Sequence, residues 1–166
     1  MTKIRKFNSS NIRQISGGKD PVRVVEDFIL RRGFSPDECL RDREVDAVRW
    51  MLRLSGGEEL ELLAEGVRKV SETTIYMGIN VATVPIRGSF DMLTAALEIA
   101  DGLVGIKLSL VGHFLVLSST LGAQGVSVEE LDYNLNLITA QHKWFREALA
   151  DELGWELVYD RGGEDQ

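Results

Sequence analysis

The stretch that decides the fold runs from Thr74 to Leu117 and reads TIYMGINVATVPIRGSFDMLTAALEIADGLVGIKLSLVGHFLVL. Its apolar residues first recur at every second position, as in a half-buried strand, at Ile75, Met77, Ile79 and Val81. After Ser89, which suits a helix N-cap, they follow helical spacing as far as Gly102, at Phe90, Leu93, Leu97 and Ala100. Alternation then returns on both sides of Gly112-His113. The stretch therefore predicts a strand, a helix and a two-strand hairpin.

The segment before it predicts one helix and a loop. Asp20 is a good N-cap and Pro21 suits the first helical turn, where its missing N–H costs nothing. An apolar face follows, and Gly33 can adopt the left-handed conformation that ends a helix. We expect a polar loop over residues 35–44.

Two further strands are expected between this loop and Thr74. Apolar residues alternate from Ala47 to Leu54, and Gly56-Gly57 provides a turn. Residues 58–70 fit two patterns, because Leu60, Leu62 and Ala64 alternate while other apolar residues follow helical spacing. The glycine turn, together with Gly66, which would weaken a helix, favours the strand.

A long amphipathic helix is predicted at the end of the chain. Ser127 and Glu130 form a capping box, and Gly154 ends the pattern. One apolar stripe contains Leu131, Leu135, Ile138, Phe145 and Leu149. A neighbouring stripe contains Tyr133, Leu137, Ala140, Trp144 and Ala148, and Trp155, Leu157 and Tyr159 alternate beyond the helix. The whole order predicts a two-layer α+β fold, helix-β-β-β-helix-β-β-helix, with one mostly antiparallel sheet.

Length and charge limit the possible functions. The chain has 166 residues and a net charge of −7, enough for one core at residues 20–159, with flexible ends at 1–19 and 160–166. Residues 1–23 carry a net +5, so the remainder carries −12. Such an acidic body repels phosphates, which argues against duplex nucleic-acid binding by the folded domain. No transmembrane segment, signal peptide or disulfide is expected, and the cytoplasm is the simplest location.

No catalytic or metal-binding set is predicted. The two histidines, His113 in the hairpin turn and His142 on the last helix, lack partners at zinc-ligand spacing. Cys39 follows Asp37 and Glu38, which should raise the pKa of its thiol. Ser16 to Asp20 reads SGGKD, similar to the phosphate loop of ATP pyrophosphatases, but Pro21 replaces the family's final serine and no buried strand precedes it. We therefore expect no enzyme activity, no cofactor and no metal.

The order of elements, the small size, the acidic balance and the amphipathic last helix resemble class I type III secretion chaperones and their YbjN-like relatives. The resemblance covers about Asp20 to Gly154 and contains no signature motif. It implies a homodimer joined through a middle helix and the next strand, here residues 89–101 and 103–110. It also implies a bacterial protein that binds another protein or an unfolded segment, as the secretion chaperones do.

We therefore expect a non-enzymatic, chaperone-like or regulatory protein-binding module. The expected dimer interface consists of Phe90, Met92, Leu93, Leu97, Ile106 and Leu108. The expected partner-binding residues are Tyr133, Leu137, Trp144 and Trp155, unless the leader or the tail covers them. Two alternatives remain open: a nucleotide- or phosphate-binding protein that uses Ser16–Asp20, or a tethering protein that uses the basic leader.

Overall fold

The computed structural model describes residues 20–44, 46–55, 57–67, 72–85 and 87–153. Its elements follow the order α1 (Pro21–Arg31), α2 (Pro36–Cys39), β1 (Leu40–Arg43), β2 (Ala47–Arg53), β3 (Glu59–Val67), β4 (Glu72–Thr83), α3 (Ser89–Ala100), β5 (Lys107–Val111), β6 (Phe114–Gly122) and α4 (Val128–Leu153). The predicted α+β class is confirmed. Residues 1–19 and 154–166 lie outside the described residues, as do the expectations placed on them.

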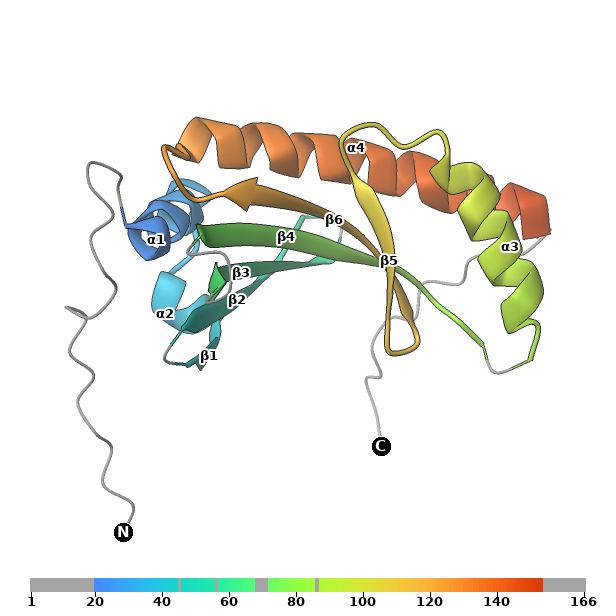
Figure 1. Cartoon of the computed structure of the whole chain (residues 1–166), viewed down its shortest axis with the longest axis horizontal. Helices are drawn as coiled ribbons and strands as arrows, with labels where there is room; N and C mark the ends of the chain where they lie inside the picture. The colour runs from blue at the N-terminus through green and yellow to red at the C-terminus, as the bar shows by residue number, and fades with distance from the viewer. Residues whose placement is uncertain (1–19, 45, 56, 68–71, 86, 154–166) are drawn as a thin grey trace, which may run out of the picture.

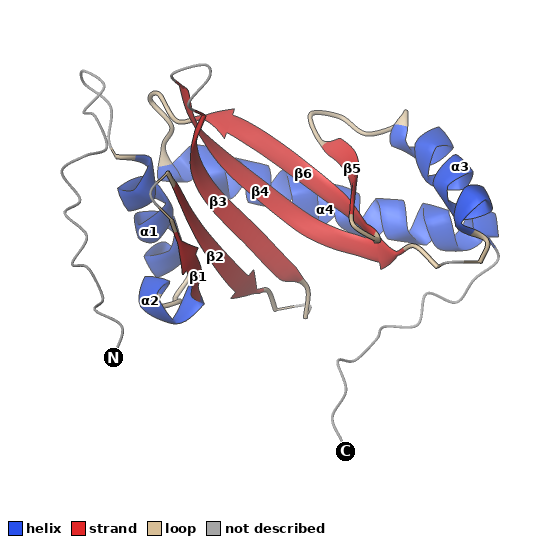
Figure 2. Cartoon of the chain, turned by 60° about the horizontal axis from the view of Figure 1, so that its bottom comes forward, coloured by secondary structure: helices blue, strands red, loops and turns tan. Residues whose placement is uncertain are grey.

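One antiparallel sheet with strand order β1-β2-β3-β4-β6-β5 forms the first layer. Helices α1 and α4 form the second layer on one face of the sheet, and Figure 2 shows the sheet with α4 behind it. Helix α3 lies beyond one end of the sheet, beside the C-terminal half of α4 (Figure 1). The arrangement is therefore two-layered, with one helix projecting past the sheet.

The predicted polar loop over residues 35–44 is wrong. Pro36 begins a short helix with Asp37 and Glu38 in its first turn, and Leu40–Arg43 pairs with β2 as a sixth strand at the edge of the sheet. The strand escaped prediction because Arg41, Asp42 and Arg43 are all exposed, so no apolar alternation marks it. Charged residues are usual on edge strands, where they oppose pairing with another chain.

The other predicted elements are present at nearly the predicted bounds. Residues 59–67 form a strand, paired in register with β2 and β4, which settles the choice left open for this segment. The Ser127–Glu130 capping box forms as expected, with hydrogen bonds of 3.0 and 3.2 Å. Asp20 caps α1 by accepting a 3.0 Å hydrogen bond from the Val22 amide. At α3, the N-cap is Gly88, whose φ of 77° suits glycine, rather than Ser89.

The core lies between the helices and the inner face of the sheet. Trp50, Phe28 and Phe145 are its largest fully buried side chains and come from β2, α1 and α4. The predicted core stripe of α4 is confirmed, since Leu131, Leu135, Ile138 and Leu149 are all buried. Arg31, the last residue of α1, and its C-cap Arg32 form ion pairs with Glu129 and Asp132 of α4 at 2.7–3.5 Å, which link the end of α1 to the start of α4.

Candidate protein-binding surfaces

Helix α3 buries one of its sides and leaves two large apolar side chains exposed on another. Met92, Ala95 and Ala96 are buried, and the main contacts of the helix are with α4 rather than with the sheet. Phe90 is 79% exposed and Leu97 is 69% exposed. Seven residues apart, these two lie on one side of the helix, about two turns from each other. The outer side of α3 is therefore an apolar surface without a partner in the described chain.

The connection from α3 to β5 is fixed to α4 by one side chain. Gln141 accepts a 2.9 Å hydrogen bond from the Val104 amide and donates one of 2.7 Å to the Val104 carbonyl. This pairing satisfies both backbone groups of Val104 and leaves its side chain 73% exposed. Sequence analysis included Val104 in the expected contact range 103–110 but did not single it out, because an isolated apolar residue in a loop carries no periodic signal.

Gly102 lets this loop lie close against the outer stripe of α4. A Cβ at Gly102 would lie 2.8 Å from Cη2 of Trp144, whereas one at Gly105 would make only an ordinary contact, 3.5 Å from Cδ2 of Leu137. Trp144 is still 44% exposed, and Tyr133, farther along α4, is 67% exposed. The loop after α3 thus partly covers Leu137 and Trp144, a role that the sequence suggested for the leader or the tail. Trp155 lies outside the described residues.

Strand β5 adds apolar surface at the free edge of the sheet. Leu110 and Val111 are more than half exposed, whereas Ile106 is buried and Leu108 is partly buried. Of the expected interface residues, Phe90 and Leu97 are therefore open and Leu93 and Leu108 are partly open. Met92 and Ile106 belong to the chain's own core. Val104, Leu110 and Val111, in the same segment of the chain, are exposed.

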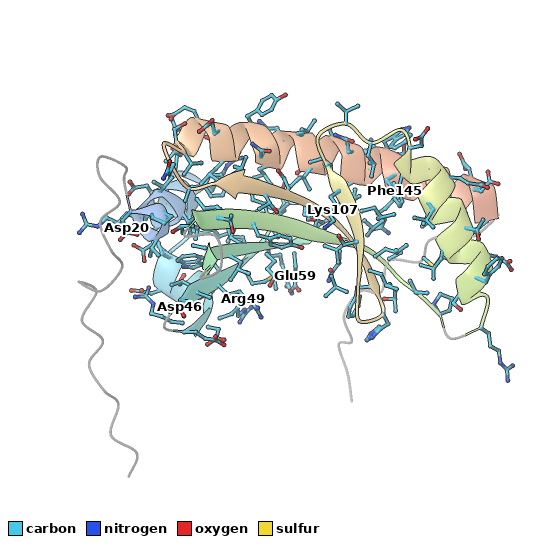
Figure 3. All side chains as sticks on the ribbon, viewed as in Figure 1. Asp20, Asp46, Arg49, Glu59, Lys107 and Phe145 are labelled. Carbon is cyan, nitrogen blue, oxygen red and sulfur yellow. The ribbon has the colours of Figure 1, made fainter. Side chains whose placement is uncertain are left out.

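The sheet face away from the helices is mixed in character. Arg49 pairs with Glu61 at 3.0 Å and Arg53 with Glu59 at 3.6 Å, and Figure 3 shows Arg49 and Glu59 on this side of the sheet. Tyr76 lies along its own strand over Gly78, where a Cβ would come within 2.8 Å of its ring. Burial, and next the nearby Glu61 carboxylate, raises the pKa of Tyr76. Paired charges make this face a weaker candidate for apolar docking than α3.

His142 and Cys39, two side chains with catalytic potential, are both buried. His142 is 2% exposed and its Nε2 lies 3.1 Å from the Asn80 carbonyl, as expected for a buried, hydrogen-bonded histidine. Burial lowers the pKa of His142. Cys39 is buried, and burial followed by Glu38 raises the pKa of its thiol, which makes it a poor nucleophile.

Among the described residues, no three His, Cys, Asp or Glu side chains gather as a metal site would require. Within the same part of the chain, no helix is both long enough and apolar enough to cross a bilayer. Of the Ser16–Asp20 phosphate-loop candidate, Asp20 alone is described, and its carboxylate caps α1.

A groove of about 970 Å³ runs along the flank of α4 opposite the α3–β5 loop. Its walls come from α4, from the β2–β3 turn and from the segment after α1. They include Arg32, Phe34, Leu54, Glu58, Thr139, Ala140, Lys143, Arg146 and Ala150.

Neither a protein-family model nor a curated protein matches the sequence. Solved structures do match. The chain is similar to one in the HopA1–SchA chaperone–effector complex, with 13% identity, a TM-score of 0.51 and coverage of 76% of this chain and 92% of that one. It is also similar to a chain in the heterodimeric ExoU–SpcU complex from the type III secretion system of Pseudomonas aeruginosa, with 16% identity, a TM-score of 0.52 and coverage of 76% of this chain and 98% of that one. A third similar chain is in the ExsC–ExsE complex, with 16% identity, a TM-score of 0.53 and coverage of 76% of this chain and 91% of that one.

Identities this low carry information about the fold alone, and the fold is similar over nearly the whole length of each matched chain. The expectation from the order of elements is thereby confirmed. The chain has the fold of type III secretion chaperones.

Proposed function

We propose that this chain is a non-enzymatic, chaperone-like protein-binding module that acts as a homodimer in the bacterial cytoplasm. The observation that carries the proposal is the outer side of α3, where Phe90 and Leu97 are largely exposed on a helix that projects past the sheet. Apolar patches of this kind on a folded domain usually mark an interface. A secretion chaperone and a YbjN-like protein without a secretion system both fit this proposal.

A twofold interface would cover several exposed apolar residues that lie near one another in the sequence. In an isologous dimer the same patch of each subunit is buried against its copy. Residues 89–111 supply candidates for this patch, with Phe90 and Leu97 on α3, Val104 in the loop and Leu110 and Val111 on β5, whereas Leu30, Tyr133 and Trp144 are exposed on other helices. Dimerisation through this segment leaves the outer stripe of α4, with Tyr133 and the exposed part of Trp144, available to a protein partner, together with the groove on the other flank of α4 and the outer face of the sheet.

The structural neighbours support a protein partner. Their complexes pair SchA with the effector HopA1, SpcU with ExoU and ExsC with ExsE. The partner of this chain is sought by pull-down from its native lysate, followed by binding of the purified candidate segment measured by calorimetry. Trp144→Ala serves as the test variant and Gln124→Ala, in the exposed β6–α4 loop, as the control. Loss of binding in the first alone places the partner near the outer stripe of α4.

Thermal-shift measurements with ATP, pyrophosphate and Mg²⁺ test the rival nucleotide-binding function. A ligand present at a hundred times its Kd stabilises a fold by about 2.7 kcal/mol, which is easily seen as a higher melting temperature. No shift is expected here. A shift that Lys19→Ala abolishes would overturn the proposal in favour of phosphate binding by Ser16–Asp20.

A further inference from the structure

The chain between α3 and β5, residues 101–106, forms a strap that passes beside α4 (Figure 1). Leu137, Gln141 and Trp144 share the flank of α4 that the strap crosses, because they follow one another at intervals of four and three residues. The backbone at Gly102 lies so close to this flank that a Cβ there would be 2.8 Å from Cη2 of Trp144. The strap therefore covers part of the outer stripe of α4.

A single side chain of α4 holds the middle of the strap. Gln141 accepts a hydrogen bond from the Val104 amide and donates one to the Val104 carbonyl, and both bonds are exposed to water, which competes for the same groups. Leu103 is only partly buried, whereas Ile106 belongs to the core and anchors the end of the strap. Segments with few buried contacts and solvent-exposed hydrogen bonds open at a low cost in free energy. The strap can therefore leave Trp144 while the rest of the fold stays intact.

The strap also carries one residue of the proposed dimer surface. The Val104 side chain is 73% exposed, and it lies in the same segment of the chain as Phe90 and Leu97 of α3. The two hydrogen bonds to Gln141 fix the backbone of Val104 and therefore the place of its side chain in this surface. One loop thus contributes to the dimer surface and covers part of α4.

We infer that dimerisation holds the strap closed over the outer stripe of α4. The inference rests on the proposed homodimer, because a second subunit covers Val104 only while Gln141 holds the strap in place. Covering the exposed part of a valine side chain makes the closed strap roughly 5-fold to 40-fold more favourable in the dimer than in the monomer. Since such coupling is reciprocal, a partner segment that needs Leu137 and the whole of Trp144 binds the monomer more tightly and weakens the dimer. Tyr133 and the exposed part of Trp144 stay accessible in both states.

Amide hydrogen exchange of the full chain, followed by NMR, tests the inference. The Val104 amide exchanges when its hydrogen bond to Gln141 opens, so its protection factor reports the closed strap. At a concentration where sedimentation shows a wild-type dimer and a Phe90→Ala monomer, we expect this factor to be roughly 5-fold to 40-fold larger in the dimer. The Leu131 amide, which donates to the Ser127 carbonyl at the start of α4, is the internal control and should differ much less.

The indole of Trp144 gives a second readout, which does not depend on the dimer. In the full chain labelled with 5-fluorotryptophan, its fluorine signal is identified by its loss in Trp144→Phe. Gln141→Ala removes both hydrogen bonds to the strap and should increase the H₂O-to-D₂O shift of this signal. Gln141→Met, which keeps nearly the same side-chain shape without the amide, should do the same. Gln124→Ala, outside the strap, should leave the shift unchanged.

The contrary results can be told apart. Equal Val104 protection in the wild-type dimer and in the Phe90→Ala monomer would overturn the inference and leave the proposed dimer standing. An unchanged Trp144 shift in both Gln141 variants, with melting temperatures that show intact folds, would mean that Gln141 does not hold the strap over the ring, and the inference would again be wrong. A wild-type chain that sediments as a monomer at every concentration would refute the proposed dimer and the inference together.

Discussion

Replacing Phe90 by alanine should dissociate the proposed homodimer without unfolding the chain. Phe90 is 79% exposed, so it contributes little to the fold of one protomer. Burying a whole phenylalanine side chain stabilises by about 1.5–3 kcal/mol, so covering the exposed part of Phe90 is worth about 1.2–2.4 kcal/mol.

The twofold axis doubles this contribution. The dimer contains two Phe90 side chains, one from each protomer, and Phe90→Ala removes both. The substitution therefore weakens the dimer by about 2.4–4.7 kcal/mol, or roughly 50-fold to 2,000-fold in Kd. The upper part of this range holds where the two side chains are covered completely. The melting temperature at concentrations that keep both proteins monomeric should barely change.

Sedimentation equilibrium over a range of concentrations measures this Kd directly. Leu30→Ala is the matched control, because Leu30 is 57% exposed on α1, outside the proposed interface. It should leave the dimer Kd unchanged. A wild-type protein that is monomeric at low micromolar concentration would refute the proposed dimer. A dimer that Phe90→Ala leaves intact would refute its placement on α3.

Three further outcomes follow from the packing around α4. Gln141→Ala removes both hydrogen bonds to Val104, so it should cost about 1–2 kcal/mol of folding stability and also weaken the dimer. The control Gln124→Ala should do neither. Equal dimer Kd values for wild type and Gln141→Ala would show that the dimer does not depend on these two hydrogen bonds. Phe145→Ala, in the core, should cost about 3–5 kcal/mol in chemical denaturation, and Trp144→Ala, which is 44% exposed, about 1–3; a larger cost for Trp144 would mean that its ring is buried in solution. Burial lowers the pKa of His142, so as the pH falls the unfolded state takes up a proton before the folded state does. The contribution of this histidine to stability is therefore complete above about pH 6.5, the pKa in the unfolded state, and decreases as the pH falls below it. The decrease in melting temperature below that pH should be smaller in His142→Gln, and identical pH profiles would contradict the assignment.

Sequence analysis worked where one side of an element is buried against this chain and the other faces water. Helix α4 has a capping box at its start and a core stripe that the structure confirms residue by residue. Strands β2, β3 and β4 alternate because their inner side chains reach the core and their outer ones do not. In these elements the spacing of the apolar residues is enough to identify both the type of element and its buried side.

The analysis failed where neither side is buried. Strand β1 lies at the edge of the sheet and exposes Arg41, Asp42 and Arg43, so nothing in its composition separates it from a loop. The role of Gln141 was also not predictable, because one glutamine among many polar residues carries no signal until Val104 is placed opposite it. Both omissions concern residues whose environment is created by elements distant in sequence.

Helix α3 shows the limit of periodicity most clearly. Its sequence is apolar on more than one side, and the spacing of the apolar residues does not say which side meets the rest of the chain. The structure places Met92, Ala95 and Ala96 against the chain and leaves Phe90 and Leu97 outside. Two alanines on the inner side allow α3 to approach α4 closely, whereas large side chains there would hold the helices apart. Phe90 and Leu97 thus remain on the side where a second subunit can cover them, which is why the helix with the fewest contacts to the sheet carries the strongest indication of an assembly.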